Sequence, residues 1–268
     1  MHEYFSALIL GIVEGLTEFL PVSSTGHLIL VNEWVKLPEP FSNMFNIVIQ
    51  MGAILAVVIY FWGRLMPIQP KLEKLQRDRI WLLWGKVILA VIPALVLGFL
   101  FKDIIEIYLM KPLVVGGALL IYGIVLILIE RQTWKPKYED AVDLPWKIVL
   151  TIGFIQCLAL VPGTSRSAAT IIGALILGSS RKAAAEFSFF LAIPTLTAAS
   201  LYSLLKYKDP LSGTELMTLG IGFLVSFLVA WGVIALFMNW VSKKDFKIFG
   251  WYRIILGAAV LAYFLWIK

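Results

Sequence analysis

Six apolar runs in the chain are each about as long as the roughly 20 residues that a helix needs to cross a lipid bilayer. Soluble domains contain roughly 45–50% apolar and about 25% charged residues. This chain of 268 residues is 60% hydrophobic and 15% charged, with a mean hydropathy of +0.88. One core of this size cannot hold that excess, so the sequence predicts an all-α integral membrane protein. The predicted spans are about 44–63, 82–101, 112–130, 184–206, 215–239 and 248–267.

Two further apolar regions are each interrupted by a polar, turn-forming cluster. Region 4–36 contains PVSSTGH at 21–27, and region 147–178 contains PGTSRS at 162–167. A straight span would not carry such a cluster at membrane depth, whereas a helix that enters, breaks and returns on the same side would. We therefore predict that both regions are re-entrant hairpins.

Basic residues are distributed unevenly over the segments that connect these spans. If the first hairpin returns outside and the second inside, the inside segments hold 14 Lys and Arg residues and the outside segments 6. Cytoplasmic loops are enriched in Lys and Arg, so this bias predicts that both termini lie outside. It also accounts for the net charge of +6 without a nucleic-acid partner.

The two hairpin regions resemble each other in sequence. GIVEGLTEFLPVSS at 11–24 aligns with GFIQCLALVPGTS at 153–165 when one residue is skipped before the proline, which places Glu14 opposite Gln156. Three spans follow each hairpin, and an odd number inverts the second repeat relative to the first. Chance similarity between apolar sequences is the alternative. The predicted organisation is a single membrane domain, 1–268, with repeat one at 1–130, a charged connector at 131–147 and repeat two at 148–268.

The first hairpin carries ionisable side chains, which are costly inside a membrane and therefore indicate function. Glu14 and Glu18 are four residues apart, so they share one helix face. A divalent cation would satisfy both carboxylates, and hydroxyl partners or protonation on burial are the alternatives. His27 follows beside three consecutive hydroxyl residues, which favours a general acid or base over a packing histidine.

Arg166 is the most informative residue of the second hairpin. A Pro–Gly turn precedes it, and the following hydroxyl residues can cap a helix whose first N–H groups form an anion site. A guanidinium at that position suits phosphate. A buried ion pair with a glutamate of the other hairpin is an alternative that does not exclude phosphate binding. The hydroxyl side chains predicted to bind phosphate with Arg166 are those of Ser165, Ser167 and Thr170.

EGLTEFLPVSSTGH (14–27) together with PGTSRSAAT (162–170) resembles the paired signature of the bacterial undecaprenyl-diphosphatases, the bacitracin-resistance type of membrane phosphatase. The similarity extends over most of the chain, including FNIVIQMGAILAVV (45–58) and AAEFSFFLAIP (184–194). Ala168 departs from the glycine of many members but changes no polar group. The resemblance implies two inverted repeats, each a re-entrant hairpin plus three transmembrane helices.

The resemblance also implies an activity: removal of the terminal phosphate of undecaprenyl diphosphate, which gives the monophosphate lipid carrier of cell-wall synthesis. It implies dependence on Mg²⁺ or Ca²⁺, with Glu14 and Glu18 at the metal and the diphosphate. Glu18, His27 and Arg166 are then catalytic residues, with His27 the acid–base residue and Arg166 bound to phosphate. Ser24 is the position proposed as nucleophile, with an attacking water as the alternative. Ser23 and Thr25 complete the substrate-binding hydroxyls.

The substrate implied is a polyprenyl diphosphate lipid, and the implied location is the bacterial inner membrane with the site facing outward. The sequence leaves the oligomeric state open, with a dimer among the alternatives. A transporter or flippase for an anionic lipid or solute is the rival function, because inverted repeats and broken helices are transporter devices. Anion transport would need Arg166, but it gives no reason for His27 beside paired carboxylates and a hydroxyl run.

Overall fold

The computed structural model describes residues 2–132 and 135–267. The first and last residues, and positions 133 and 134 of the predicted connector, lie outside these ranges. Within them the chain forms helices and no β-strand, apart from one isolated bridge between Tyr138 and Ser179. The prediction of an all-α protein is therefore confirmed for the described residues.

In the described ranges, six helical segments are long and apolar enough to cross a membrane. This number agrees with the prediction, but several helices extend beyond their apolar runs. α6 begins at Lys74, because Glu73 and Gln76 form a capping box in the charged segment before the apolar run. The six segments are α3–α4 (Phe41–Val48 and Gln50–Tyr60), α6 (Lys74–Leu100), α8 (Pro112–Glu130), α11 (Arg181–Lys206), α12 (Gly213–Val241) and α13 (Lys247–Ala262) with the π-helical turn Tyr263–Ile267.

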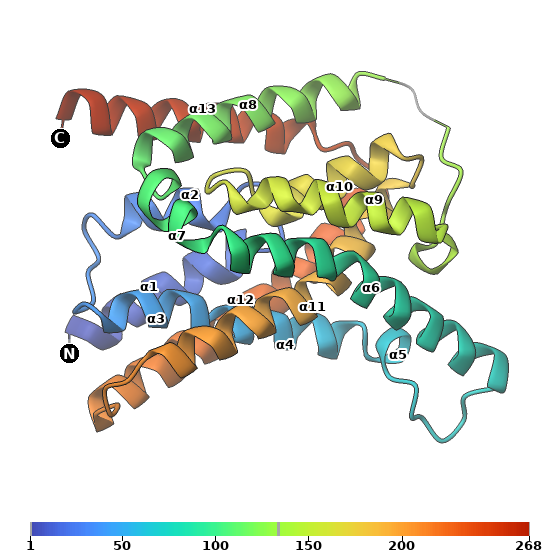
Figure 1. Cartoon of the computed structure of the whole chain (residues 1–268), viewed down its shortest axis with the longest axis horizontal. Helices are drawn as coiled ribbons and strands as arrows, with labels where there is room; N and C mark the ends of the chain where they lie inside the picture. The colour runs from blue at the N-terminus through green and yellow to red at the C-terminus, as the bar shows by residue number, and fades with distance from the viewer. Residues whose placement is uncertain (1, 133–134, 268) are drawn as a thin grey trace.

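Each of the two remaining apolar regions forms a pair of short helices separated by a break. The first pair is α1 (His2–Thr17) and α2 (Ser24–Val31), and the second is α9 (Trp146–Gln156) and α10 (Arg166–Ile176). In Figure 1 the first pair leaves from and returns to the end of the bundle that holds both termini, and the second pair does so at the opposite end. The breaks lie where the sequence predicts them, while the re-entrant placement in a bilayer stays a prediction. The other short elements are α5 (Trp62–Leu65), α7 (Lys102–Ile104), the π-helical turn Ile105–Leu109, and the 3₁₀ turns Ala141–Asp143 and Cys157–Leu160.

The two breaks share one backbone conformation. Ser23 and Ser165 both have φ 72°, and they are the non-glycine residues with positive φ in the described chain. Each is the N-cap of the second helix of its pair, accepting a hydrogen bond from Gly26 N and Ala168 N respectively. Ser23 and Ser165 are 142 residues apart, as are Glu14 and Gln156. The gap placed before the proline in the sequence alignment is therefore wrong. It matched the two prolines, and so it moved the two cap serines, which are equivalent in the structure, out of alignment.

Helix contacts are exchanged between the two halves. α1 packs on α12, its counterpart α9 packs on α6, and α8 lies along α13 (Figure 1). α2 and α10 both contact α8. These contacts support the inverted repeat, which stays a prediction.

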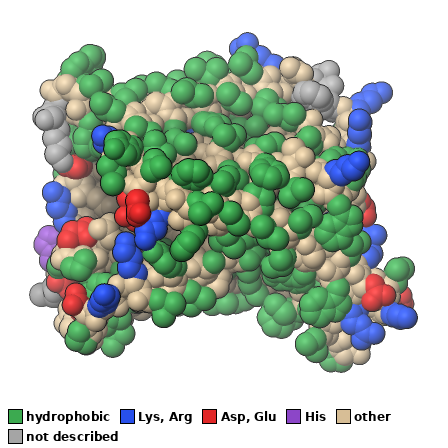
Figure 2. Space-filling model, in the orientation of Figure 1, with side chains coloured by type: hydrophobic (Ala, Val, Ile, Leu, Met, Phe, Trp, Pro, Cys, Tyr) green, Lys and Arg blue, Asp and Glu red, His purple; other side chains and the backbone are tan. Residues whose placement is uncertain are grey.

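Charged side chains gather mainly toward the two ends of the molecule, and hydrophobic side chains cover the face between them (Figure 2). At the end opposite the termini, Arg64 pairs with Asp140 and Glu186. Glu186 of α11 is thus an ion-pair partner of Arg64 on the short helix that follows α4.

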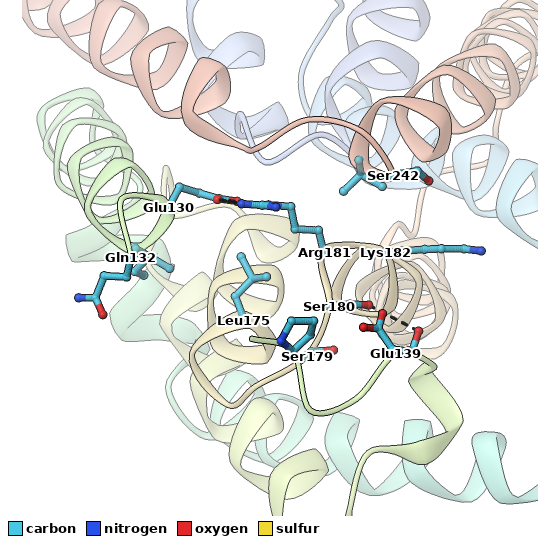
Figure 3. A pocket seen from close by; sticks show the side chains of 12 residues that line it. Glu130, Gln132, Glu139, Leu175, Ser179, Ser180, Arg181, Lys182 and Ser242 are labelled. Carbon is cyan, nitrogen blue, oxygen red and sulfur yellow. Dashed lines mark hydrogen bonds and ion pairs between the residues drawn. The ribbon is translucent and has the colours of Figure 1, made fainter. Parts of the chain in front are cut away.

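A cavity of about 340 Å³ lies at that same end, where Arg181 pairs with Glu130 (Figure 3). Glu130 also accepts a hydrogen bond from Phe246 N, so this pair connects the end of α8 and the start of α11 to the start of α13. None of the residues predicted to bind substrate or metal lines this cavity.

Close helix contacts depend on glycine at the α4–α12 interface, which gives a prediction of stability. A Cβ added at Gly52 would lie 3.1 Å from Phe227 N and closer still to Phe223 O, both backbone atoms. We expect Gly52→Ala to lower the free energy of unfolding by about 1–3 kcal/mol, measured by thermal unfolding in detergent. The matched control is Gly232→Ala in α12, where nothing lies within 4 Å and alanine favours the helix. Equal melting temperatures for the two variants would contradict the close packing.

Candidate active site

The fully buried guanidinium of Arg253, on α13, joins the two breaks. Its Nη2 donates to Gly163 O at 2.8 Å and to Thr164 O at 2.9 Å in the second break. Its Nη1 donates to Pro21 O at 3.3 Å in the first break. Sequence reasoning missed Arg253, although an arginine in mid-span is itself a signal of function.

Arg166 and Glu18 form an ion pair between the hairpins. Arg166 Nη2 lies 3.0 Å from Glu18 Oε1, and the two side chains are 10% and 7% exposed. Arg166 Nη1 also donates to Ser188 O at 2.7 Å, which fixes the guanidinium against α11. The ion pair considered as an alternative is therefore present. Phosphate binding by Arg166 stays a prediction that the pair does not exclude.

Ser24 is the next member of this arrangement. Its Oγ donates to Glu18 Oε2 at 2.7 Å, so one carboxylate contacts both the predicted nucleophile and the predicted phosphate-binding cation. Ser24 lies at the first position of α2, directly after the break, which places its hydroxyl at the junction of the two hairpins. An ionised carboxylate in that position can align the hydroxyl or accept its proton.

His27 lies one turn further along α2 and makes different contacts. Its Nδ1 is 2.7 Å from Ser23 O, and its Nε2 is 2.7 Å from Tyr252 Oη on α13. The structure therefore pairs Ser24 with Glu18 and His27 with Tyr252. Sequence reasoning missed Tyr252, because a tyrosine in an apolar run has the same pattern as an ordinary interfacial aromatic residue.

The hydroxyls of the second hairpin are engaged within the protein. Ser167 Oγ donates to Leu20 O at 2.9 Å and lies 2.9 Å from Ser165 Oγ. Thr170 Oγ1 bonds Ser188 Oγ at 2.7 Å, and Ser167 and Thr170 are each 1% exposed. These bonds hold α10 against the first break and α11. Substrate binding by these residues stays a prediction.

The remaining predicted hydroxyl residues lie at the start of α2. Ser23 is 2% exposed and its side chain caps the helix at Gly26 N, 3.3 Å away. Thr25 is half-buried in the first turn beside Ser24. Both stand next to the Glu18–Ser24 pair, but the cap already engages the hydroxyl of Ser23.

Glu14 lies beside Glu18 but outside this set of hydrogen bonds. It is 0% exposed, and neither carboxylate oxygen has a hydrogen-bond partner among the described residues. A buried carboxylate without a partner is costly, so a proton or a cation is expected there. No group of three or more His, Cys, Asp or Glu side chains suited to a metal occurs in the described parts of the chain. Glu14 and Glu18 therefore fit a divalent cation only as a two-carboxylate site whose other ligands come from water or substrate oxygens.

The helices and the polar centre define a class of protein: a multi-pass membrane protein with a buried arginine–carboxylate–serine arrangement where two broken helices meet. The sequence profile of one family, described as bacitracin resistance protein BacA, matches residues 7–259. The chain belongs to this BacA family.

Several curated relatives align over nearly the whole chain. An undecaprenyl-diphosphatase of Limosilactobacillus fermentum is 52% identical over 271 residues, covering 98% of each chain. An undecaprenyl-diphosphatase 1 of Clostridioides difficile is 52% identical over 264 residues, covering 98% of this chain and 96% of its own. An undecaprenyl-diphosphatase of Lactiplantibacillus plantarum is 47% identical over 271 residues, covering 98% of each.

The bonds of Arg253 predict the effect of removing its guanidinium. Arg253→Met would leave three buried carbonyl oxygens without this donor, and each unsatisfied group costs about 1–3 kcal/mol. We expect a loss of at least about 2 kcal/mol in the free energy of unfolding, measured by thermal unfolding in detergent. The exposed Arg77 gives a matched control, and Arg77→Met should change it by less than about 0.5 kcal/mol. A loss no larger than that of the control would refute a clamp at the breaks.

Proposed function

We propose that this chain hydrolyses undecaprenyl diphosphate to undecaprenyl phosphate and inorganic phosphate, which recycles the lipid carrier for cell-wall synthesis. The observation that carries the proposal is the buried contact of Glu18 with both Arg166 and Ser24 where the two breaks meet. Membership of the BacA family and the names of the aligned relatives support the same activity.

The site suits phosphoryl transfer because that reaction needs charge stabilisation and alignment more than covalent help. Arg166 binds non-bridging oxygens of the terminal phosphate, with its second contact to Ser188 O holding the guanidinium in place. If Ser24 attacks the terminal phosphorus, Glu18, to which its hydroxyl is bonded, takes its proton and undecaprenyl phosphate leaves; water then hydrolyses the phosphoseryl bond and releases inorganic phosphate. If a water attacks instead, the same pair orients that water. His27 moves a proton at Nε2, at the leaving oxygen or the attacking one.

A divalent cation, Mg²⁺ or Ca²⁺, is proposed at Glu14 and Glu18. When bound, the cation neutralises charge on the diphosphate, and it lowers the electrostatic cost of bringing the diphosphate close to two carboxylates. The support is Glu14 itself, whose buried oxygens lack partners within the described chain.

The substrate is proposed to reach the site from the membrane. A polyprenyl tail stays in hydrocarbon while the diphosphate enters at the hairpin breaks, so helices that open laterally suit such a lipid. The chain is a multi-pass membrane protein, and the bacterial inner membrane with an outward-facing site is the proposed placement. A flippase or transporter of an anionic lipid is the second candidate, favoured by the exchanged helix contacts of the two halves.

The activity is tested by measuring phosphate release from undecaprenyl diphosphate by purified protein, with Mg²⁺, with Ca²⁺ and with EDTA. We expect metal-dependent release that falls by at least about 100-fold in His27→Ala and Arg166→Ala, because an acid–base group contributes about 10²–10⁴-fold. Arg79→Ala is the matched control, since Arg79 forms an exposed ion pair with Asp143 remote from the breaks.

Two outcomes would count against the proposal. Folded parent protein that releases no phosphate under any metal would favour the anionic-lipid carrier. Release that is unaffected by EDTA would leave the phosphatase standing and remove the metal from Glu14 and Glu18.

The outward orientation is tested separately by cysteine labelling. In a Cys157→Ser background, Thr25→Cys should react with a membrane-impermeant maleimide added outside intact spheroplasts. Arg77→Cys, in the basic segment predicted inside, should react only after the membrane is opened. The reverse pattern would invert the proposed topology.

A further inference from the structure

Both ring nitrogens of His27 have partners, and one partner decides the protonation of the ring. Nδ1 lies 2.7 Å from the carbonyl oxygen of Ser23, and a carbonyl can only accept a hydrogen bond. Nδ1 therefore carries the proton. In a neutral imidazole the other nitrogen, Nε2, is then the basic one.

The basic nitrogen faces a tyrosine hydroxyl. Tyr252 Oη lies 2.7 Å from Nε2, so the hydroxyl donates to it. The two rings are almost parallel, with 11° between their planes and 5.5 Å between centroids. Tyr252 thus restrains both the direction of Nε2 and the tilt of the imidazole.

Tyr252 is itself held in place relative to the breaks. Its neighbour Arg253 is fully buried and bonds the carbonyls of Pro21, Gly163 and Thr164. α13 also packs against α2, which carries His27. The tyrosine is 45% exposed, so it stands at the open side of His27 and not in the buried centre with Glu18.

We infer that Tyr252 is a positioning residue, which holds the basic nitrogen of His27 toward the open side of the site. Ser24 is bonded to Glu18, so the site keeps two separate proton-handling pairs, Ser24–Glu18 and His27–Tyr252. Tyr252 acts through its contact with His27, and the inference gives it no role in activating the nucleophile. The kinetic consequence of this inference rests on the proposed phosphatase function.

The kinetic test uses Tyr252→Phe, which keeps the stacked ring and removes only the hydroxyl. We expect kcat to fall by about 10-fold while KM changes by less than about 2-fold, since the loss is in acid–base chemistry and not in substrate binding. Tyr202→Phe is the matched control: Tyr202 is also 45% exposed, and its hydroxyl bonds Lys102 Nζ at 3.0 Å. That control should change kcat by less than about 2-fold.

A spectroscopic test reads the hydrogen bond without any turnover. The chain has two histidines, so His2→Gln leaves His27 as the sole histidine for ¹⁵N NMR of the labelled ring. We expect one Nδ1-protonated species, and Tyr252→Phe should displace the Nε2 resonance while Tyr202→Phe leaves it unchanged. Melting temperatures of all variants exclude global unfolding as the cause.

The outcomes separate this inference from the proposed function. An Nε2 resonance unmoved by Tyr252→Phe overturns the inference, as does a displaced resonance with unchanged kcat. A parent protein that releases no phosphate refutes the proposed function, and the inference then stands or falls on the Nε2 resonance alone.

Discussion

A helix that ends in the interior of a protein leaves backbone carbonyls that water cannot reach, and the rest of this molecule depends on how these carbonyls are satisfied. The guanidinium of Arg253 donates to three of them, one in the first break and two in the second. Because a single side chain contacts both breaks, the two hairpins cannot shift independently. The contact between Glu18 and Arg166, 148 residues apart, relies on that registration.

The two glutamates of the polar centre differ in their partners. Glu18 contacts a cation through one oxygen and a hydroxyl through the other, while Glu14 a turn earlier has no such partners among the described residues. An ionised carboxylate buried without a partner is unfavourable, whereas a site that binds a charged ligand benefits from keeping some charge unsatisfied. This difference is consistent with a structural role for Glu18, which contacts Arg166 and Ser24, and with a ligand-binding role for Glu14.

The sequence predicted those features that arise from neighbouring residues. Apolar length determined the six spans, and proline, glycine and serine clusters located both breaks, because each signal lies within about 20 residues. Apart from the ion pair of Arg166 with a glutamate of the other hairpin, contacts between distant residues were not predicted: His27 meets Tyr252 across 225 positions, and no local pattern distinguishes that tyrosine. The alignment of the hairpins erred by one residue for a related reason. It matched proline letters, whereas the equivalence lies in the shared backbone conformation of Ser23 and Ser165.

Ser23 and Ser165 have a backbone conformation that residues other than glycine seldom adopt, with φ 72° at both. Glycine would relieve about 1–3 kcal/mol of that strain and, because glycine is itself a tolerated N-cap, would lose only a few tenths of a kcal/mol with the hydroxyl, so it would stabilise the fold while removing the side chain. Heat tolerance is consequently a poor guide at these positions. A selection for thermostability would retain variants at these two positions that have lost the geometry of the site. Variants of the breaks must therefore be ranked by their activity and not by their melting temperature.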